Sequence, residues 1–299
     1  MITVSSLTKT YGGFTAVDDV SFTAQTGRVT GFLGPNGAGK STTMRIMVGL
    51  TPASTGTALI DGRRFVDLPN PGAEVGVLLD ASAQHAGRTG REILTIAQRT
   101  MGLPKARVQD MLELVSLTDE EADRRVRNYS LGMRQRLGIG TALLGDPHVL
   151  ILDEPANGLD PAGIRWMRDL LRGYADRGGT VLLSSHLLHE IEVIADDLVV
   201  IGNGRIVAQG TKAELLASAG TVARASDAVA LASAVERAGH AVTVHADGSI
   251  HTEATTEQVG VAALAAGLAL TELRAADGAG LEEMFLELTA DTQREGAAA

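Results

Sequence analysis

The sequence predicts an α/β fold in which a parallel sheet carries a glycine-rich loop between a buried strand and a helix. Three observations predict it. Residues 34–41 form a glycine-rich octapeptide, and short apolar runs such as residues 149–152 and 181–184 have the length and composition of buried parallel strands. Thr-x-x-Glu segments, which are typical of helix starts, separate these runs along the chain. Strands that alternate with helices in this way indicate a layered α/β core.

The glycine-rich loop fits the phosphate-binding pattern G-x-x-x-x-G-K-[ST] at each fixed position. An apolar run at residues 29–33 enters it as a strand, and residues 42–50 leave it as a helix, so backbone N–H groups converge where a phosphate would lie. The alternative is a glycine-rich turn without a ligand. Lys40 is predicted to place a positive charge next to the β- and γ-phosphates, and Ser41 is predicted to ligate magnesium. The predicted cofactor-binding residues of the loop are Gly34, Pro35, Asn36, Gly37, Ala38, Gly39, Lys40, Ser41 and Thr42.

Composition restricts the classes of protein to which the chain can belong. Its 299 residues suggest about two domains, and 44% hydrophobic residues suffice for a core. A net charge of −10 argues against nucleic acid as a partner. The absence of cysteine excludes disulfides, thiol nucleophiles and cysteine metal sites.

The sequence shows no signal for secretion or for crossing a membrane. The N-terminal residues 1–4 include no basic segment followed by an apolar region, so we expect no signal peptide. The most continuous apolar stretch, residues 259–270, is shorter than the roughly 20 residues that a spanning helix needs. We therefore expect a soluble protein, and any membrane span must come from another polypeptide.

The first elements are predicted to be antiparallel strands beside the loop. Residues 2–7, 17–24 and 57–60 have strand composition, and the last run leads into Asp61-Gly62, a two-residue hairpin signal. Tyr11 lies between the first two runs. Its ring could stack on an adenine base or be an ordinary half-buried tyrosine.

A helical insert is predicted over residues 85–145. Thr89 with Glu92, and Thr118 with Glu121, form the pattern of a capping box, and Pro104 precedes apolar residues at helical spacing over 108–117. Parallel strands are then predicted at 149–152 and 181–184, with a helix from Pro161 between them.

The composition changes after Gly220, where a second domain is predicted. We expect residues 1–220 to form the first domain and residues 221–299 a small α+β accessory domain. The runs at 221–225, 227–238, 241–245, 249–253, 256–267 and 269–274 follow the order β-α-β-β-α-β, which is that of a ferredoxin-like module. An amphipathic helix is predicted at 281–288.

The strand at 149–152 ends in Asp153-Glu154. These two carboxylates can supply a metal ligand and a base, which phosphoryl transfer from ATP requires and which the loop lacks. Asp153 can hold magnesium, directly or through water, and Glu154 can orient and deprotonate a water molecule that attacks a phosphate. An acidic pair alone is more often a solvated strand end. Downstream of a phosphate-binding loop, however, the pair indicates hydrolysis of ATP.

Three further stretches resemble motifs of ATP-binding cassette (ABC) ATPases, in the order of that family. Residues 129–136 resemble the signature motif, residues 157–160 the D-loop, and residues 184–186 the switch histidine. The resemblance covers about residues 1–220. It implies an ABC cassette of the P-loop NTPase class, with an antiparallel β subdomain, a RecA-like parallel core and a helical insert.

The resemblance also implies how the site works. Two copies sandwich ATP, so that Ser130 and Gly132 grip the γ-phosphate bound by the other copy and Asp160 reaches over the interface. His186 is implied to contact the γ-phosphate and to hold Glu154 and the water in line. The implied catalytic residues are Glu154, His186 and Lys40, and the cofactors are ATP and Mg²⁺.

The chain departs from the family pattern in two motifs, the signature motif and the Q-loop. Leu131 and Met133 stand where the signature motif usually has glycine and glutamine, and the loss of backbone freedom at Leu131 is expected to weaken the phosphate grip. Asp80 stands where the Q-loop has glutamine. A carboxylate there can still ligate magnesium, but it adds a third negative group near Asp153 and Glu154.

Within the family, the resemblance favours exporter ATPases of the antibiotic- and daunorubicin-resistance type. Residues 280–289 resemble the closing helix of that subgroup's accessory domain. This implies a cytoplasmic subunit that is held at the inner face of the cell membrane by a separate permease. The alternatives are an ABC ATPase that acts on ribosomes or DNA, and a nucleotide-binding regulator that does not hydrolyse ATP.

Overall fold

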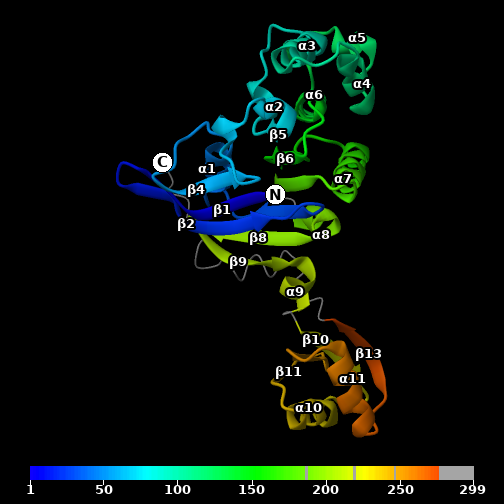
Figure 1. Cartoon of the computed structure of the whole chain (residues 1–299). Coiled ribbons are helices and arrows are strands. Elements are labelled where there is room, and N and C mark those ends of the chain that lie inside the picture. The colour runs from blue at the N-terminus through cyan, green and yellow to red at the C-terminus, as the bar shows by residue number, and fades with distance from the viewer. Residues whose placement is uncertain (186–187, 218–219, 246, 276–299) are drawn as a thin grey trace, which may run out of the picture. The chain divides into compact units, whose positions relative to one another are not determined.

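The computed structural model describes residues 1–185, 188–217, 220–245 and 247–275. The chain divides into two compact units: Met1–Gln209 belongs to the first, and the second begins at Gly210 (Figure 1). This division precedes the composition change after Gly220 by about one short helix, α9 (Lys212–Ala217).

A six-stranded sheet forms the centre of the first unit, in the order β5-β6-β7-β3-β8-β9. Its pairs β3·β7, β3·β8, β5·β6 and β6·β7 are parallel. Every residue of β3, β6 and β7 is buried, which explains why these strands are mostly apolar instead of alternating between apolar and polar residues. The strands are β3 (Val29–Leu33), β5 (Val75–Leu78), β6 (Val149–Leu152), β7 (Thr180–Ser184), β8 (Asp197–Gly202) and β9 (Arg205–Thr211).

The predicted antiparallel strands form a separate three-stranded sheet, in the order β2-β1-β4. It consists of β1 (Ile2–Tyr11), β2 (Phe14–Ala24) and β4 (Thr55–Ile60), so the first two strands are longer than the apolar runs that predicted them. Asp61 and Gly62 turn the chain with φ of 47° and 78°. The amide of Ile60 then donates to the carbonyl of Arg63 at 2.7 Å, so the predicted tight turn forms.

Helices follow the strands of the first unit and build the insert between β5 and β6. Both predicted capping boxes of the insert are present, at Thr89 and Thr118. The helix predicted up to residue 117 ends at Leu114, because Ser116 takes a left-handed conformation with φ of 55°. The helices are α1 (Lys40–Met47), η1 (Phe65–Asp67), α2 (Pro71–Glu74), η2 (Ala81–Ala83), α3 (Gly90–Met101), α4 (Ala106–Leu114), α5 (Asp119–Ala122), η3 (Val126–Asn128), α6 (Leu131–Leu143), α7 (Pro161–Asp176) and α8 (Leu188–Ile194).

The second unit contains a four-stranded antiparallel sheet in the order β11-β12-β10-β13. Two helices pack on it around a core that includes Leu231, Val235, Ile250 and Val259. The elements are β10 (Thr221–Ala225), α10 (Ala228–Arg237), β11 (Val242–Val244), β12 (Ile250–Thr252), α11 (Thr256–Ala265) and β13 (Leu270–Ala275). The ferredoxin-like assignment stays a prediction, and the helix predicted at 281–288 lies outside the described residues.

None of the helices that the structure describes is long and apolar enough to cross a membrane.

Candidate nucleotide-binding site

The glycine-rich loop connects β3 to α1 at the carboxyl end of the central sheet, and close contacts require two of its glycines. A Cβ atom on Gly34 would lie 2.4 Å from the carbonyl oxygen of Ile201. One on Gly39 would lie 2.6 Å from the carbonyl oxygen of Ala16, and Gly39 has φ of 109° as the N-cap of α1. Only glycine fits these positions without displacing backbone. The loop therefore holds its N–H groups at the start of α1, as an anion site requires.

Lys40, the first residue of α1, is almost buried, with 7% of its surface exposed. Its Nζ donates to the carbonyl oxygens of Gly34 at 2.5 Å and Pro35 at 3.2 Å, so the ammonium lies over the loop. Burial lowers the pKa of Lys40, while the nearby charges of Glu154 and Asp153 act to raise it. The side chain thus places a positive charge at the loop and faces both carboxylates.

Asp153 follows β6 and lies beside Ser41, although 112 residues separate them in the chain. Ser41 Oγ donates to Asp153 Oδ2 at 2.6 Å. The other oxygen of Asp153 accepts a hydrogen bond from Ser184 Oγ, at the end of β7. One hydroxyl and one carboxylate oriented in this way match the hard oxygen ligands that Mg²⁺ prefers.

Glu154 has an unusual backbone that three neighbours hold. Its φ is 50°, which is uncommon for a residue other than glycine. Its N–H donates to Ser184 Oγ at 3.0 Å. Its carbonyl oxygen accepts from Gln135 Nε2 at 3.0 Å and from the amide of Asn157 at 3.1 Å. Glu154 is therefore fixed on both sides of its Cα atom.

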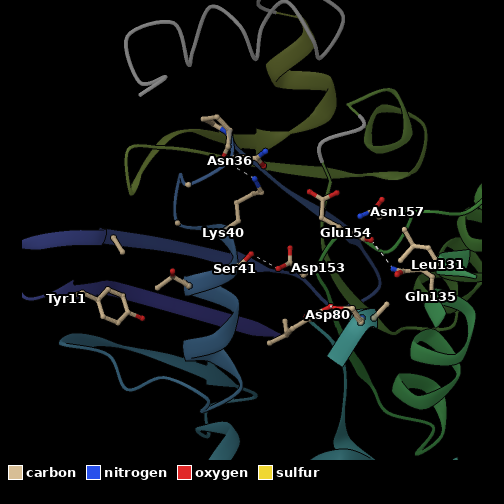
Figure 2. Close-up of a pocket in the computed structure, with 18 of the residues that line it drawn as sticks. Tyr11, Asn36, Lys40, Ser41, Asp80, Leu131, Gln135, Asp153, Glu154 and Asn157 are labelled. Carbon is tan, nitrogen blue, oxygen red and sulfur yellow. Dashed lines mark hydrogen bonds between the residues drawn. The ribbon is translucent and has the colours of Figure 1, made fainter. Parts of the chain in front are cut away.

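These side chains surround one cavity of about 750 Å³, which is large enough for a nucleotide. Figure 2 shows Lys40, Ser41, Asp153 and Glu154 around the same space, with Tyr11 at one side and Asp80 at another. Of the predicted loop residues, those that line the cavity are Pro35, Asn36, Gly37, Gly39, Lys40, Ser41 and Thr42.

Comparison with known proteins shows the family to which the chain belongs. The ABC transporter family model matches residues 17–157. The chain is 43% identical over 210 residues to the ABC transporter ATP-binding protein YhcH of Bacillus subtilis, an alignment that covers 69% of this chain and 68% of the relative. The chain belongs to the ABC transporter ATP-binding proteins.

Other members of the family support the assignment. This ABC protein is 40% identical over 210 residues to the bacitracin transport ATP-binding protein BcrA of Bacillus licheniformis, covering 69% of this chain and 68% of the relative. A solved structure titled as the ATP-binding subunit of an ABC transporter superimposes with a TM-score of 0.66 and 30% identity, over 72% of this chain and 91% of that one. The predicted α/β ABC cassette is thereby confirmed.

Tyr11 ends β1 and has about half of its surface exposed at the edge of the cavity. The Nζ atom of Lys9 lies 4.8 Å from the centroid of its ring and also donates to the carbonyl oxygen of Pro52 at 2.8 Å. An aromatic ring that is held in this way is suited to stacking on a base.

Asp80 lines the cavity as the N-cap of η2. Its Oδ1 atom accepts hydrogen bonds from the hydroxyl of Ser82 at 2.6 Å and from the amide of Ser82 at 2.7 Å, and these bonds lower the pKa of Asp80. Among the described residues, no three His, Cys, Asp or Glu side chains form a group that could hold a metal. Ser41 and Asp153 offer oxygen atoms of the kind that Mg²⁺ prefers, and the roles of Ser41, Asp153 and Asp80 as metal ligands stay predictions.

Two residues of the signature motif and one of the D-loop lie in a different hollow of the cassette. Ser130 is the N-cap of α6, where its Oγ accepts from the amide of Met133 at 3.2 Å. Ser130, Gly132 and Asp160 line a hollow of about 390 Å³, and none of them lines the cavity at the glycine-rich loop. Asp160 caps α7 by accepting from the amide of Gly163 at 2.8 Å. Within one chain, the structure therefore does not bring these three residues to the loop.

Sequence reasoning missed Ser184 and Gln135 as members of the site. Ser184 ends the strand next to β6, so the parallel order of the sheet places it beside Asp153. Knowledge of the strand order would have found it, whereas nothing in local sequence places Gln135 next to Glu154. His186, the predicted switch histidine, lies outside the described residues.

Proposed function

We propose that this ABC protein is the ATP-hydrolysing subunit of an exporter and works as a pair of identical chains with a separate permease. The observation that carries the proposal is the meeting of Lys40, the Ser41–Asp153 pair and Glu154 around one cavity. Each side chain matches one requirement of phosphoryl transfer from ATP: a cation for the phosphates, oxygen ligands for a metal, and a base for water.

In this proposal, the loop N–H groups and Lys40 bind the β- and γ-phosphates. Ser41 and Asp153 would hold Mg²⁺, which would supply positive charge next to the phosphate oxygens. Glu154 orients a water molecule and accepts its proton as the water attacks the γ-phosphorus. Tyr11 stacks on the adenine, and His186 contacts the γ-phosphate.

The second copy supplies the signature residues. Because Ser130, Gly132 and Asp160 of one chain line a hollow away from its own loop, they are available to the ATP held by the other copy. The N-terminus of α6, capped by Ser130, then faces a negatively charged phosphate, which its dipole favours.

The exported compound is proposed to be a drug or antibiotic, because relatives are named as transport proteins for bacitracin and for a lantibiotic. The permease would hold the cassette at the cytoplasmic face of the cell membrane. We take residues 1–220 as the nucleotide-binding domain and residues 221–299 as an accessory domain. Co-purification with the membrane protein encoded beside it tests the permease assignment, and a chain that elutes alone from such a preparation contradicts it.

Turnover of the Glu154→Gln variant tests the hydrolysis. We expect the wild type to release phosphate from ATP and the variant to lose about a hundredfold or more of kcat, because the amide cannot accept the proton. The variant is expected to form a dimer with ATP that size-exclusion chromatography detects. Glu236→Gln changes an exposed glutamate in the second unit and serves as the charge-matched control. Equal turnover in all three proteins contradicts the proposal.

A further inference from the structure

A buried glutamine connects the signature helix to the backbone of Glu154. Gln135 lies in α6, slightly more than one turn after Ser130, and only 3% of its surface is exposed. Its Nε2 atom donates to the carbonyl oxygen of Glu154 at 3.0 Å (Figure 2). Gln135 also lines the nucleotide cavity together with Leu131 and Glu154. A buried amide that reaches across to another segment usually serves to fix a relative position.

The position that it fixes is an uncommon one. Glu154 has φ of 50°, and the direction of its side chain follows from that backbone conformation. The hydroxyl of Ser184 holds the N–H of Glu154, and the amide of Asn157 holds the carbonyl oxygen from within the same turn. Gln135 provides the hydrogen bond to this carbonyl that comes from a different element of the fold.

We infer that Gln135 is a positioning residue for ATP hydrolysis, which ties the helix capped by Ser130 to the backbone conformation that aims Glu154 into the cavity. The inference rests on the proposed function, because it assumes that Glu154 acts on water. The Gln135 hydrogen bond connects α6, whose N-terminus is proposed to meet the ATP of the other copy, to the base in its own chain.

Two variants test it in the full-length protein. Gln135→Leu removes the donor and fills similar space, whereas Gln135→Glu keeps the shape but offers only acceptors to a carbonyl oxygen at neutral pH. We expect kcat for ATP to fall by about three- to tenfold in Gln135→Leu and at least as much in Gln135→Glu. We expect the KM for ATP to change less than about twofold, because the phosphate-binding loop is untouched.

Gln98→Leu is the matched control, because Gln98 is also a buried amide that donates to a backbone carbonyl, that of Leu103. Gln98 does not line the cavity, so its variant should keep the wild-type kcat. If Gln135→Leu or Gln135→Glu is as active as the wild type, or if KM and kcat change by equal factors, the inference is wrong.

Hydrogen exchange gives a readout that does not depend on turnover. The amide of Asn157 bonds to the same carbonyl as Gln135, so peptides that span residues 153–159 should exchange about threefold faster or more in Gln135→Leu and at the wild-type rate in Gln98→Leu. Unchanged exchange overturns the inference. A wild-type protein that does not hydrolyse ATP overturns the proposed function, and the exchange result then still decides whether Gln135 holds the turn.

Discussion

Leu131 packs against Gly158, where the start of the signature helix meets the loop after β6. A Cβ atom on Gly158 would lie 2.3 Å from Leu131 Cγ, and Gly158 has φ of 76°. The side chain that replaces the usual glycine of the signature motif is therefore accommodated by a glycine in the D-loop.

This contact predicts a coupled pair of substitutions. Gly158→Ala should destabilise the protein by more than the roughly 1–2 kcal/mol that a left-handed conformation costs alanine, because the added methyl also meets Leu131. Leu131→Gly should relieve the clash. The double variant should therefore lose less unfolding free energy than the two single variants lose together. Thermal unfolding of the three variants measures the coupling, and strict additivity would contradict the contact.

The hydroxyl of Ser184 lies between Asp153 and the backbone of Glu154, and we expect it to contribute to both stability and metal binding. Ser184→Ala removes the acceptor of the partly buried N–H of Glu154, which should cost about 1–3 kcal/mol of unfolding free energy. The Mg²⁺ concentration for half-maximal turnover should also rise, because Asp153 loses a bond that orients it.

Thr180→Val is the control for Ser184, since it also removes a buried hydroxyl from β7. Thr180 Oγ1 has no hydrogen-bond partner among the residues that the structure describes, so this variant should be neutral or stabilising. Urea unfolding of both variants tests the comparison, and similar losses would show that the Ser184 bonds contribute nothing particular.

Lys9 is predicted to support nucleotide binding by holding the ring of Tyr11. A cation over an exposed ring contributes about 0.5–1 kcal/mol, so Lys9→Met should weaken ATP binding by about two- to fivefold. Lys105→Met removes the same charge from an exposed site at the start of α4 and should bind ATP like the wild type. Calorimetric titration with ATP measures the affinity of both variants. If Lys9→Met binds ATP as tightly as the wild type, Lys9 does not support nucleotide binding.

Asp80 is predicted to affect hydrolysis more than binding. Asp80→Gln should retain ATP affinity and change kcat by about three- to tenfold, because it removes a negative charge and the cap of η2 from the cavity wall. Asp80→Asn keeps an acceptor for Ser82, so its kcat should lie between that of the wild type and that of Asp80→Gln. Unchanged turnover in both variants, with and without the permease, would show that Asp80 has no role in coupling.

The pH dependence of Asp80 follows from its depressed pKa. Hydrogen bonds from Ser82 lower the pKa of Asp80, so the stability that these bonds supply is present above the unfolded pKa and is lost as the pH falls through the folded one. The carboxylate is therefore charged at neutral pH. The ratio of Asp80→Asn to wild-type kcat should stay constant from about pH 6 to about pH 8. A ratio that approaches one on acidification within this range would contradict it.

Much of the site could be predicted from sequence because its chemistry lies in contiguous segments. The loop from Gly34 to Ser41 and the Asp153-Glu154 pair each follow a buried strand, and parallel strands bring their carboxyl ends to one edge of a sheet. The two capping boxes at Thr89 and Thr118 formed for a similar reason, since a capping box needs residues only three apart.

The backbone conformations of two residues could not be predicted from the neighbouring sequence. The left-handed backbone of Glu154 has no signal in a strand followed by Glu-Pro, and the helix predicted to residue 117 ended early at a left-handed Ser116. The apolar period continued through that turn, because the residues after it are also buried.

The glycine-rich loop, the acidic strand end, the helical insert and the family could be identified from local patterns, because each depends on residues close together in the chain. The folded chain was needed to show that Ser184 and Gln135 hold Glu154 and that Leu131 lies on Gly158. These contacts join separate strands and helices, and their partners are set by how the sheet and α6 pack, which no local pattern of residues encodes.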